Sequence, residues 1–536
     1  MKSIFFTIIT LIGIFTVHAQ NLWPQSILLT PEKTDFLKTS THAEVMVFMN
    51  EIKLLSNNIY TFSMGKSLEG KDIPVAVLAK PMVNTPEEAK ATGKTIVYVQ
   101  GNIHAGEVEG KESVMMLMRD ILLGNKKHLL DSLIIIFVPI YNTDANDKMA
   151  KGLRSSQEDS PLETGERESS EGYDLNRDGV KMEAKETRAL FTQVIVPWDP
   201  QIFVDLHTTN GTWHAYSLTW APSFHSAGEY GPFDYTYHKM LPTITDSCKQ
   251  KYNLLMGPYG DYYLDEGWPP KNFYSYNHHP RYLVNQFGFR NRMAILSEAF
   301  AHERFYQRIY STYSFVSEIL EYANLHSAEI IATNKQAELA TIQNVIQHAG
   351  VARKGVKFKM VPLHKLNNFI TYDYIPFKDS TDATKYYKIG KIVEYNNIDY
   401  HAKFVATKES ILPRGYIIPA EFTDIIENLK MHGVKVEKLT QNKSYTGEMY
   451  YIDSLIRDKE IFQKHYAATL YGKFNTTTQK YKKGDYIIDM AQPLSNLVFY
   501  MLEPESDDGL VHWNFFDLYI AKMQLGKKVY PVFKYY

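Results

Sequence analysis

The sequence contains one cysteine, Cys248, among its 536 residues. A single thiol excludes an intrachain disulfide framework and a cysteine-rich zinc site, so any metal must be held by histidine and carboxylate side chains. An excess of charge is also lacking, because 58 Lys and Arg residues face 60 Asp and Glu residues. Without a basic cluster or arginine–aromatic interleaving, we expect no nucleic-acid partner.

Long apolar runs are missing after the first twenty residues, so we expect no stable membrane span in the mature chain. The start of the chain is different. A charged start at Met1 is followed by an apolar run from Ile4 to Val17 and a small residue at Ala19. This pattern predicts a signal peptide over residues 1–19 and a secreted or periplasmic protein. An N-terminal membrane anchor is the alternative, but the run is shorter than a membrane span.

Strand-like and helix-like segments alternate along the first two thirds of the chain. Residues 95–99 form a β-branched run, an apolar helical stripe follows over 114–122, and residues 134–140 form another apolar run. Strand, helix and strand in this order predict an α/β fold with a mainly parallel or mixed twisted sheet and helices on both faces. An amphipathic helical segment is also expected from about residue 31 to 60, with its start region at Thr39–Thr41.

Histidine and glutamate side chains stand at the carboxyl ends of three expected strands. His104 and Glu107 follow the run 95–99, His207 ends the run 200–207, and Glu298 ends the run 290–298. The motif His-x-x-Glu alone is common among surface residues. Open α/β sheets, however, bind ligands beyond the carboxyl ends of their strands, so the four residues are expected to form one constellation.

The residue types indicate zinc chemistry. Two histidines and one carboxylate can hold a catalytic zinc and leave its fourth position to water, whose pKa the ion lowers to about 7. We therefore expect one Zn²⁺ per chain, bound by His104, Glu107 and His207. A further carboxylate must accept the proton of the water and pass it on, and Glu298 is placed for that role. A salt-bridged glutamate at a strand end is the alternative for Glu298.

The sequence resembles the zinc carboxypeptidases related to pancreatic carboxypeptidase A. The resemblance rests on His104-Ala-Gly-Glu107, Asn176-Arg177, Asp205-Leu-His207 and Leu296-Ser-Glu298, in this order. It extends to the segment Gly65-Lys-Ser-Leu-Glu-Gly-Lys and covers roughly residues 40 to 325. It implies that the two histidines and Glu107 bind zinc and that Glu298 is the acid/base.

The same resemblance implies further roles. Asn176 and Arg177 match the pair that binds the terminal carboxylate of the substrate, for which a guanidinium offers two parallel hydrogen bonds. Arg154 matches the arginine that polarises the scissile carbonyl. Tyr276 fits the spacing of the tyrosine that contacts substrate, with Tyr282 as a rival. Structural ion pairing is the alternative for Arg177.

Other parts of the chain depart from the family pattern or lie beyond it. Asp178 and a glycine follow Asn176-Arg177, which puts the substrate in doubt more than the hydrolysis. The polar stretch 157–172 is interpreted as a solvated loop. After about residue 350, strand-like segments alternate with turns. We therefore predict a catalytic domain over 20–348 and a β-rich C-terminal domain over 349–536.

The main functional hypothesis is an exported zinc metallocarboxypeptidase that removes the last residue of a peptide with a free C-terminal carboxylate. A zinc amidohydrolase acting on cell-wall peptides or acylated amino acids is the second hypothesis. The third is a catalytically degenerate binding protein, against which the complete set of ligands and Glu298 argues.

Overall fold

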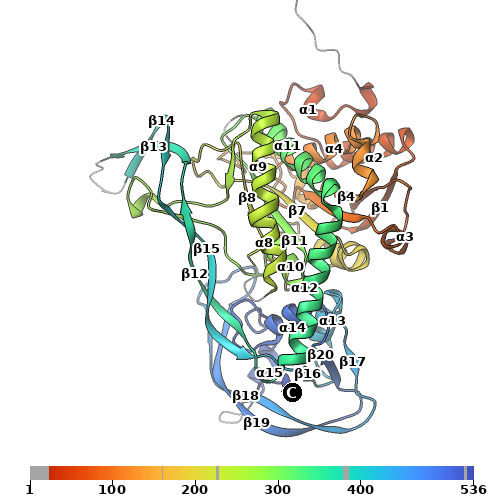
Figure 1. Ribbon diagram of the computed structural model, residues 1–536, viewed down its shortest axis with the longest axis vertical. Coiled ribbons are helices and arrows are strands. Elements are labelled where there is room, and N and C mark those ends of the chain that lie inside the picture. The colour runs from red at the N-terminus through yellow and green to blue at the C-terminus, as the bar shows by residue number, and fades with distance from the viewer. Residues whose placement is uncertain (1–22, 158, 160, 225–227, 378–384, 524–527) are drawn as a thin grey trace, which may run out of the picture.

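The computed structural model describes residues 23–157, 159, 161–224, 228–377, 385–523 and 528–536. The predicted signal peptide, residues 1–19, lies outside the described residues. Within the part that is described, none of the helices combines the length and the apolar character needed to cross a membrane. The chain forms an upper body and a lower body, with the C-terminal residues in the lower one (Figure 1).

An eight-stranded mixed sheet forms the centre of the upper body, in the order β1-β2-β4-β3-β7-β11-β8-β9. Its inner strands β4, β3, β7 and β11 run parallel, whereas β1 joins β2, β2 joins β4 and β8 joins β11 antiparallel. The strands are β1 (Ile59–Lys66), β2 (Asp72–Leu78), β3 (Thr95–Gly101), β4 (Leu133–Val138), β7 (Ile202–Thr208), β8 (Leu218–Pro222), β9 (Met256–Pro258) and β11 (Met293–Ala299). Every residue of the four inner strands is buried, which explains their continuous apolar sequences.

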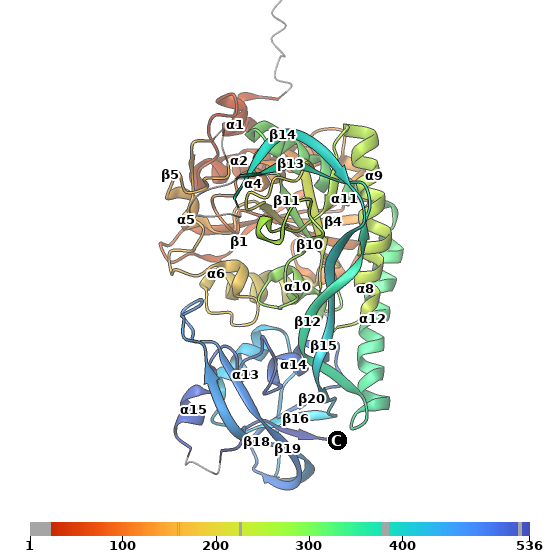
Figure 2. The same cartoon turned by 90° about the vertical axis from the view of Figure 1, so that its left-hand side faces the viewer.

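Helices flank both faces of this sheet, which confirms the predicted α/β architecture (Figures 1 and 2). Helix α4 packs against β3 and α11, and α10 packs against β7 and β11. The helices of the upper body are α1 (Thr30–Lys33), α2 (His42–Leu55), α3 (Pro86–Ala91), α4 (Glu109–Leu122), α5 (Thr143–Asp147), α6 (Lys185–Ala189), α7 (Val196–Trp198), α8 (Tyr230–Tyr235), α9 (Leu241–Tyr252), α10 (Leu283–Phe289), α11 (Phe305–Leu325) and α12 (Ser327–His348).

The helical segment expected over 31–60 is divided into α1 and α2. Thr41 ends the turn between them and caps α2: the backbone N–H of Glu44 donates to its hydroxyl at 3.3 Å. The Glu44 carboxylate in turn accepts from the Thr41 N–H at 2.8 Å. This reciprocal capping box fixes the start of α2 at His42, directly after the start region Thr39–Thr41 that the sequence predicted.

Two long strands connect the bodies. β12 (Arg353–Leu366) and β15 (Ile398–Ile411) pair antiparallel, and β15 also pairs with β10 (Asn272–Tyr274) of the upper body. Between them, β13 (Phe369–Phe377) and β14 (Lys385–Tyr395) form a hairpin that reaches over the upper body (Figure 2). Helix α12 also runs from one body to the other.

The lower body holds a six-stranded antiparallel sheet in the order β17-β20-β16-β21-β18-β19. This confirms the predicted β-rich C-terminal region. Its elements are β16 (Gly415–Ile418), α13 (Thr423–Met431), β17 (Glu437–Lys438), β18 (Lys443–Arg457), β19 (Ala468–Tyr481), β20 (Tyr486–Asp489), α14 (Ser495–Leu502), α15 (Asp517–Ala521) and β21 (Phe533–Tyr535).

The two hydrophobic cores exchange residues across the predicted domain boundary. Phe369 and Tyr400, which come after residue 349, pack in the core of the upper body. Val180 and Phe289 of the upper body pack in the core of the lower one. The boundary between 348 and 349 therefore stays a prediction, because packing crosses it in both directions.

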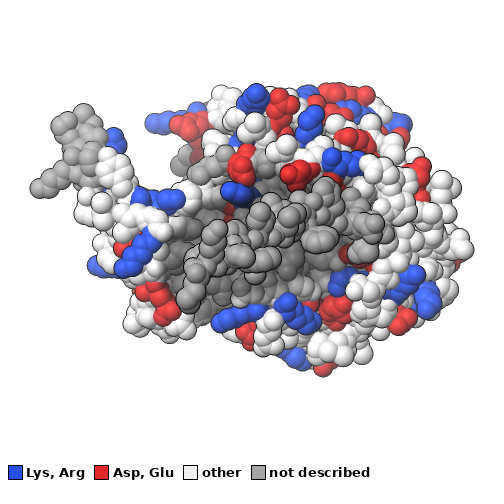
Figure 3. Space-filling view, turned by 90° about the horizontal axis from the view of Figure 1, so that it is seen from above, with Lys and Arg blue, Asp and Glu red and all other residues white. Residues whose placement is uncertain are grey.

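On the surface, acidic and basic side chains are interspersed over the visible upper face (Figure 3).

Candidate active site

The four predicted strand-end residues converge at one edge of the sheet. β3, β7 and β11 are parallel neighbours, so their carboxyl ends lie side by side. Glu298 stands directly opposite His207 in the register of β11 and β7. His104 and Glu107 lie in the connection between β3 and α4, and all four side chains are buried.

Three of these side chains present donor atoms that suit one metal ion. His104 Nδ1 lies 3.0 Å from one Glu107 oxygen, and His207 Nδ1 lies 2.9 Å from the other. One donor atom from each of the three lies within 4.8 Å of the others. Two imidazoles and a carboxylate are the ligand set of a catalytic zinc, so the donor chemistry fits the ion that the sequence predicted.

Two buried aspartates orient the imidazoles from behind. Asp174 lies 3.0 Å from His104 Nε2, and Asp205 lies 3.1 Å from His207 Nε2. Each carboxylate can accept an Nε2–H, which leaves the Nδ1 lone pair of the same ring for a metal. Burial opposes ionisation of Asp174, but its contacts with His104 and two nearby guanidiniums outweigh burial and hold its pKa well below the usual range.

Glu298 has a different environment from Glu107. Burial and the neighbouring charge of Glu107 raise the pKa of Glu298 to about 8, although His207 and Arg154 act against that shift. The pKa of Glu107 is lowered instead, because its contacts with His104 and Arg154 outweigh burial. One carboxylate of the site is therefore held ionised, and the other can exchange a proton near neutral pH.

Asn176 and Arg177 lie at the same cavity, after a short turn. The Asn176 side-chain oxygen accepts from the Leu283 N–H at 3.1 Å, and its amide nitrogen is 3.5 Å from His207 Nε2. The Arg177 guanidinium donates to the Asn176 carbonyl at 2.8 Å and lies over the Tyr282 ring, 4.5 Å from its centre. Its side chain is 20% exposed, so it remains accessible to an anionic ligand.

Arg154 lies behind the predicted ligands, outside the cavity wall. Its guanidinium is 3.0 Å from Glu107 Oε1 and donates to the Thr208 carbonyl at 3.1 Å. It therefore holds Glu107 in place.

A second guanidinium, that of Arg167, lines the cavity, whereas Arg154 does not. Two of its nitrogens contact one Asp174 oxygen at 2.7 and 3.1 Å, and a third lies 3.8 Å from Glu107. Arg167 was not predicted, because the polar stretch 157–172 has the composition of a solvated loop. The available signal was that Arg167 is the sole cation between Arg154 and Arg177.

Both tyrosine candidates line the cavity. The Tyr276 hydroxyl donates to the Pro222 carbonyl at 2.7 Å and lies 3.0 Å from the Asn285 side-chain oxygen. Tyr282 stacks beneath Arg177, and the two rings meet edge to face at 5.6 Å. Sequence spacing alone could not decide which of the two tyrosines contacts substrate, and the structure brings both of them to the site.

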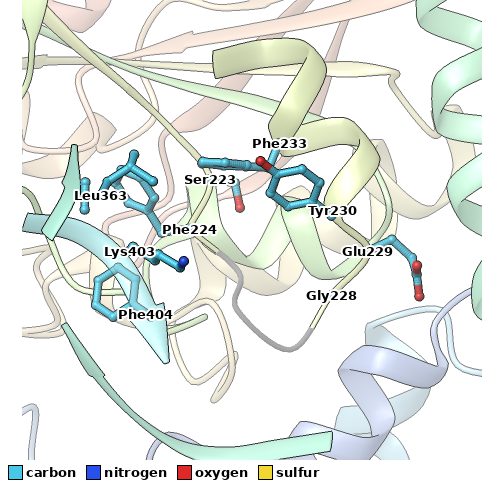
Figure 4. A pocket seen from close by; sticks show the side chains of 10 residues that line it. Ser223, Phe224, Gly228, Glu229, Tyr230, Phe233, Leu363, Lys403 and Phe404 are labelled. Atoms are coloured by element: carbon cyan, nitrogen blue, oxygen red, sulfur yellow. The ribbon is translucent and has the colours of Figure 1, made fainter. Parts of the chain in front are cut away.

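The cavity that these residues enclose has a volume of about 240 Å³ and is mostly polar. Asp261, which the sequence analysis also missed, adds a third acidic side chain to its wall. A larger cavity of about 420 Å³ lies between α8 and the strands β12 and β15, where Phe224, Phe233 and Phe404 line it (Figure 4). Its lining holds none of the predicted site residues.

Comparisons with known proteins agree with this geometry. A family model described as zinc carboxypeptidase matches residues 45–267. Probable carboxypeptidase 2 of Arthroderma benhamiae is 23% identical over 464 residues, which cover 83% of this chain and 79% of that protein. Carboxypeptidase 2 of Trichophyton rubrum is 23% identical over 505 residues, which cover 88% of this chain and 81% of that protein.

A solved structure, the metallo-carboxypeptidase from Burkholderia cenocepacia, is similar with a TM-score of 0.40 and 14% identity. The similarity covers 54% of this chain and 71% of that chain. The segment that matches the family model contains His104, Glu107 and His207. Residues 45–267 therefore match the zinc carboxypeptidase family, and the protein is a zinc-dependent metallopeptidase.

Proposed function

We propose that this protein is an exported carboxypeptidase that hydrolyses the last peptide bond of substrates with a free C-terminal carboxylate. The observation that carries the proposal is the convergence of His104, Glu107, His207 and Glu298 on one cavity that two guanidiniums also line. Export is proposed from residues 1–19, which have the pattern of a signal peptide.

The proposed ligands of one zinc per chain are His104, Glu107 and His207. When bound there, zinc would lower the pKa of a water molecule to about 7, so that the water can lose a proton and attack as hydroxide at neutral pH. Asp174 and Asp205 would fix the imidazole orientations, and Arg154 would fix the Glu107 carboxylate. Orienting partners of this kind typically contribute about 10- to 100-fold to metal affinity or activity.

The remaining polar residues are assigned by position. Glu298 is proposed to take the proton of the attacking water and deliver it to the leaving nitrogen, as its raised pKa allows. Arg177, oriented by the Asn176 carbonyl and Tyr282, is proposed to bind the substrate carboxylate. Tyr276 is proposed as a further substrate contact. Arg167, in place of Arg154, is proposed to polarise the scissile carbonyl, since its guanidinium lines the cavity.

A matched pair of peptides tests the carboxylate site. Free-acid and C-terminally amidated copies of one sequence are incubated with the zinc-loaded protein, and products are identified by mass spectrometry. The free acid is expected to lose its last residue, and the amide to be cut about 10- to 100-fold more slowly, because a charge-assisted contact contributes about 1.5–3 kcal/mol. Arg177→Ala should lower kcat/KM for the free acid and narrow the difference.

The other outcomes select between the remaining hypotheses. Equal cleavage of both peptides would contradict the proposed binding of the substrate carboxylate by Arg177 and would favour the amidohydrolase hypothesis. Zinc binding without turnover of peptides or acylated amino acids would favour a binding protein. Cleavage of internal bonds would contradict both exopeptidase assignments.

A further inference from the structure

A second cluster of metal-binding side chains lies where the two bodies meet. His278 and His279 belong to the connection between β10 and α10, and Asp507 follows α14 in the lower body. One donor atom from each lies within 4.8 Å of the others. None of the three lines the catalytic cavity, so the cluster is separate from the site described above.

The distance between His278 and Asp507 is longer than a hydrogen bond and close to the separation of two ligands of one metal ion. His278 is 2% exposed, and its Nε2 lies 3.6 Å from Asp507 Oδ2. Hydrogen bonds between nitrogen and oxygen are about 2.7–3.2 Å long. Two ligands about 2.0–2.1 Å from one tetrahedral zinc lie about 3.4 Å apart, close to the observed separation.

The His278 imidazole is held in place by its surroundings. Its Nδ1 is buried and finds no hydrogen-bond partner among the described residues. The ring is enclosed by the aromatic rings of Phe358 and Phe404, each with its centre 4.8 Å away. The enclosing rings therefore fix the orientation in which Nε2 faces Asp507.

Asp507 is held in a fixed orientation. The Phe358 backbone N–H donates to its Oδ2 at 3.0 Å, and the Tyr500 hydroxyl donates to Oδ1. Burial opposes its ionisation, but the contact with His278 and the Tyr500 hydrogen bond outweigh burial and lower the pKa of Asp507. Oriented, ionised carboxylates are the form that metal sites use.

His279 supplies the third donor, and its ring centre lies 4.8 Å from that of His278. The charge of Arg281 is compensated, since its guanidinium pairs with Asp508 at 2.7 Å.

We propose that His278, His279 and Asp507 form a second zinc-type metal site, which joins the lower body to the segment 275–282. Two imidazoles with one carboxylate favour zinc and similar transition metals over Mg²⁺ and Ca²⁺. The segment 275–282 supplies Ser275, Tyr276 and Tyr282 to the catalytic cavity. An ion at the cluster would hold that segment against the lower body. The inference does not depend on the proposed function.

Metal content of the full-length protein tests the site. The protein is saturated with Zn²⁺, dialysed against metal-free buffer and analysed by mass spectrometry for zinc per chain. Two zinc ions are expected in the parent and one in His279→Gln and in Asp507→Asn. His512→Gln is the matched control: His512 lies 3.1 Å from Arg281 but outside the three-residue cluster, so this variant should keep two.

Variants of the catalytic cluster separate the two sites. His207→Ala should keep the second ion, and zinc should raise the Tm of that variant in a concentration-dependent way. Adding His279→Gln to it should abolish this Tm increase. Circular dichroism verifies that each variant is folded. Equal zinc content in the parent, His279→Gln and Asp507→Asn, or a Tm increase that survives in the double variant, would overturn the second site and identify the cluster as ordinary packing.

Discussion

The carboxylate of Glu298 lies in the same cavity as Glu107 and Asp261. Burial and the charge of Glu107 together raise the pKa of Glu298 to about 8. Glu298→Gln keeps the shape of the side chain but cannot accept a proton. We expect kcat to fall by about 10²–10⁴-fold, because proton transfer by a positioned group is worth that much. Zinc content and circular dichroism should be unchanged. Turnover near that of the parent would remove Glu298 from the chemistry.

The two arginines of the site should have separable effects, because Arg167 lines the cavity and Arg154 does not. Arg154 contacts Glu107 and the Thr208 carbonyl from behind, whereas Arg167 lines the cavity. Arg154→Met should weaken zinc affinity by about 10- to 100-fold through loss of ligand orientation, with kcat largely recovered at saturating zinc.

Arg167→Met should have the opposite effect to Arg154→Met and impair turnover more than zinc binding. Zinc affinity should change little, while kcat and kcat/KM fall together by about 10²–10³-fold, as expected when a contact made in the transition state is lost. Competition with a chelator measures the affinity, and steady-state kinetics at saturating zinc measures kcat. If Arg154→Met lowered kcat at full zinc occupancy more than Arg167→Met, the two assignments would have to be exchanged.

Local sequence patterns predicted single residues only at strand ends, whereas Asn176, Arg177 and Tyr276 were expected from the family resemblance. His104, His207 and Glu298 each follow an apolar run, so the sequence placed them at one sheet edge before any coordinates. Arg167 lies in a loop without periodicity, between Glu and Ser residues, and nothing local indicates that it points inward. Its position depends on the ion pair with Asp174, which no pattern of spacing reveals.

At the scale of elements, the buried strands were the best predicted, because strands covered on both faces have continuous apolar sequences. The close packing of helices against these strands was not predicted. Helix α4 approaches β7 so closely that a Cβ atom on Gly110 would lie 2.7 Å from the Leu206 Cβ. That distance explains a glycine inside a helix, but it involves a strand nearly a hundred residues later in the chain.

The short helix α6 contains a buried carboxylate with a measurable effect on stability. Glu186 is 1% exposed, and neither of its oxygens has a hydrogen-bond partner among the described residues. Burial, together with nearby acidic groups, raises its pKa to about 7 from an ordinary value of 4.5. Between these two pH values the folded protein binds more protons at this site than the unfolded chain does, so stability falls as pH rises.

Glu186→Gln removes that proton linkage. The variant should be more stable than the parent above pH 7, by an amount on the order of 3 kcal/mol at most, and should match it near pH 4.5. Urea unfolding at several pH values measures the difference. A constant difference between the variant and the parent at all pH values would show that Glu186 does not titrate in this range.

At the scale of the whole molecule, the contacts that join the bodies were beyond sequence analysis, because they connect distant positions through irregular segments. The Asp174 N–H, beside the catalytic cavity, donates to the Gln463 side chain at 2.9 Å. His278 faces Asp507. Alternation of apolar residues identified the β-rich C-terminal region, but it carries no information about which loops of the upper body that region contacts.

The ion pair of Arg281 with Asp508 provides a test of this coupling between the bodies. Asp508 is fully buried and accepts from the Arg281 backbone N–H at 2.8 Å, from Arg281 Nε at 2.8 Å and from Trp513 Nε1 at 3.0 Å. Asp508→Asn leaves the guanidinium buried without its counter-charge. Removing one partner of a buried pair typically destabilises by about 3–5 kcal/mol, which urea unfolding would measure.

The control is the exposed pair of Arg457 with Asp517, which has the same 2.7 Å separation but side chains that are 42% and 24% exposed. Asp517→Asn should cost less than about 1 kcal/mol, because water screens surface pairs. Asp508→Asn should also raise KM, since Arg281 lies in the segment that brings Tyr276 and Tyr282 to the cavity. Equal effects of the two variants on stability and KM would mean that the lower body folds without supporting the catalytic cavity.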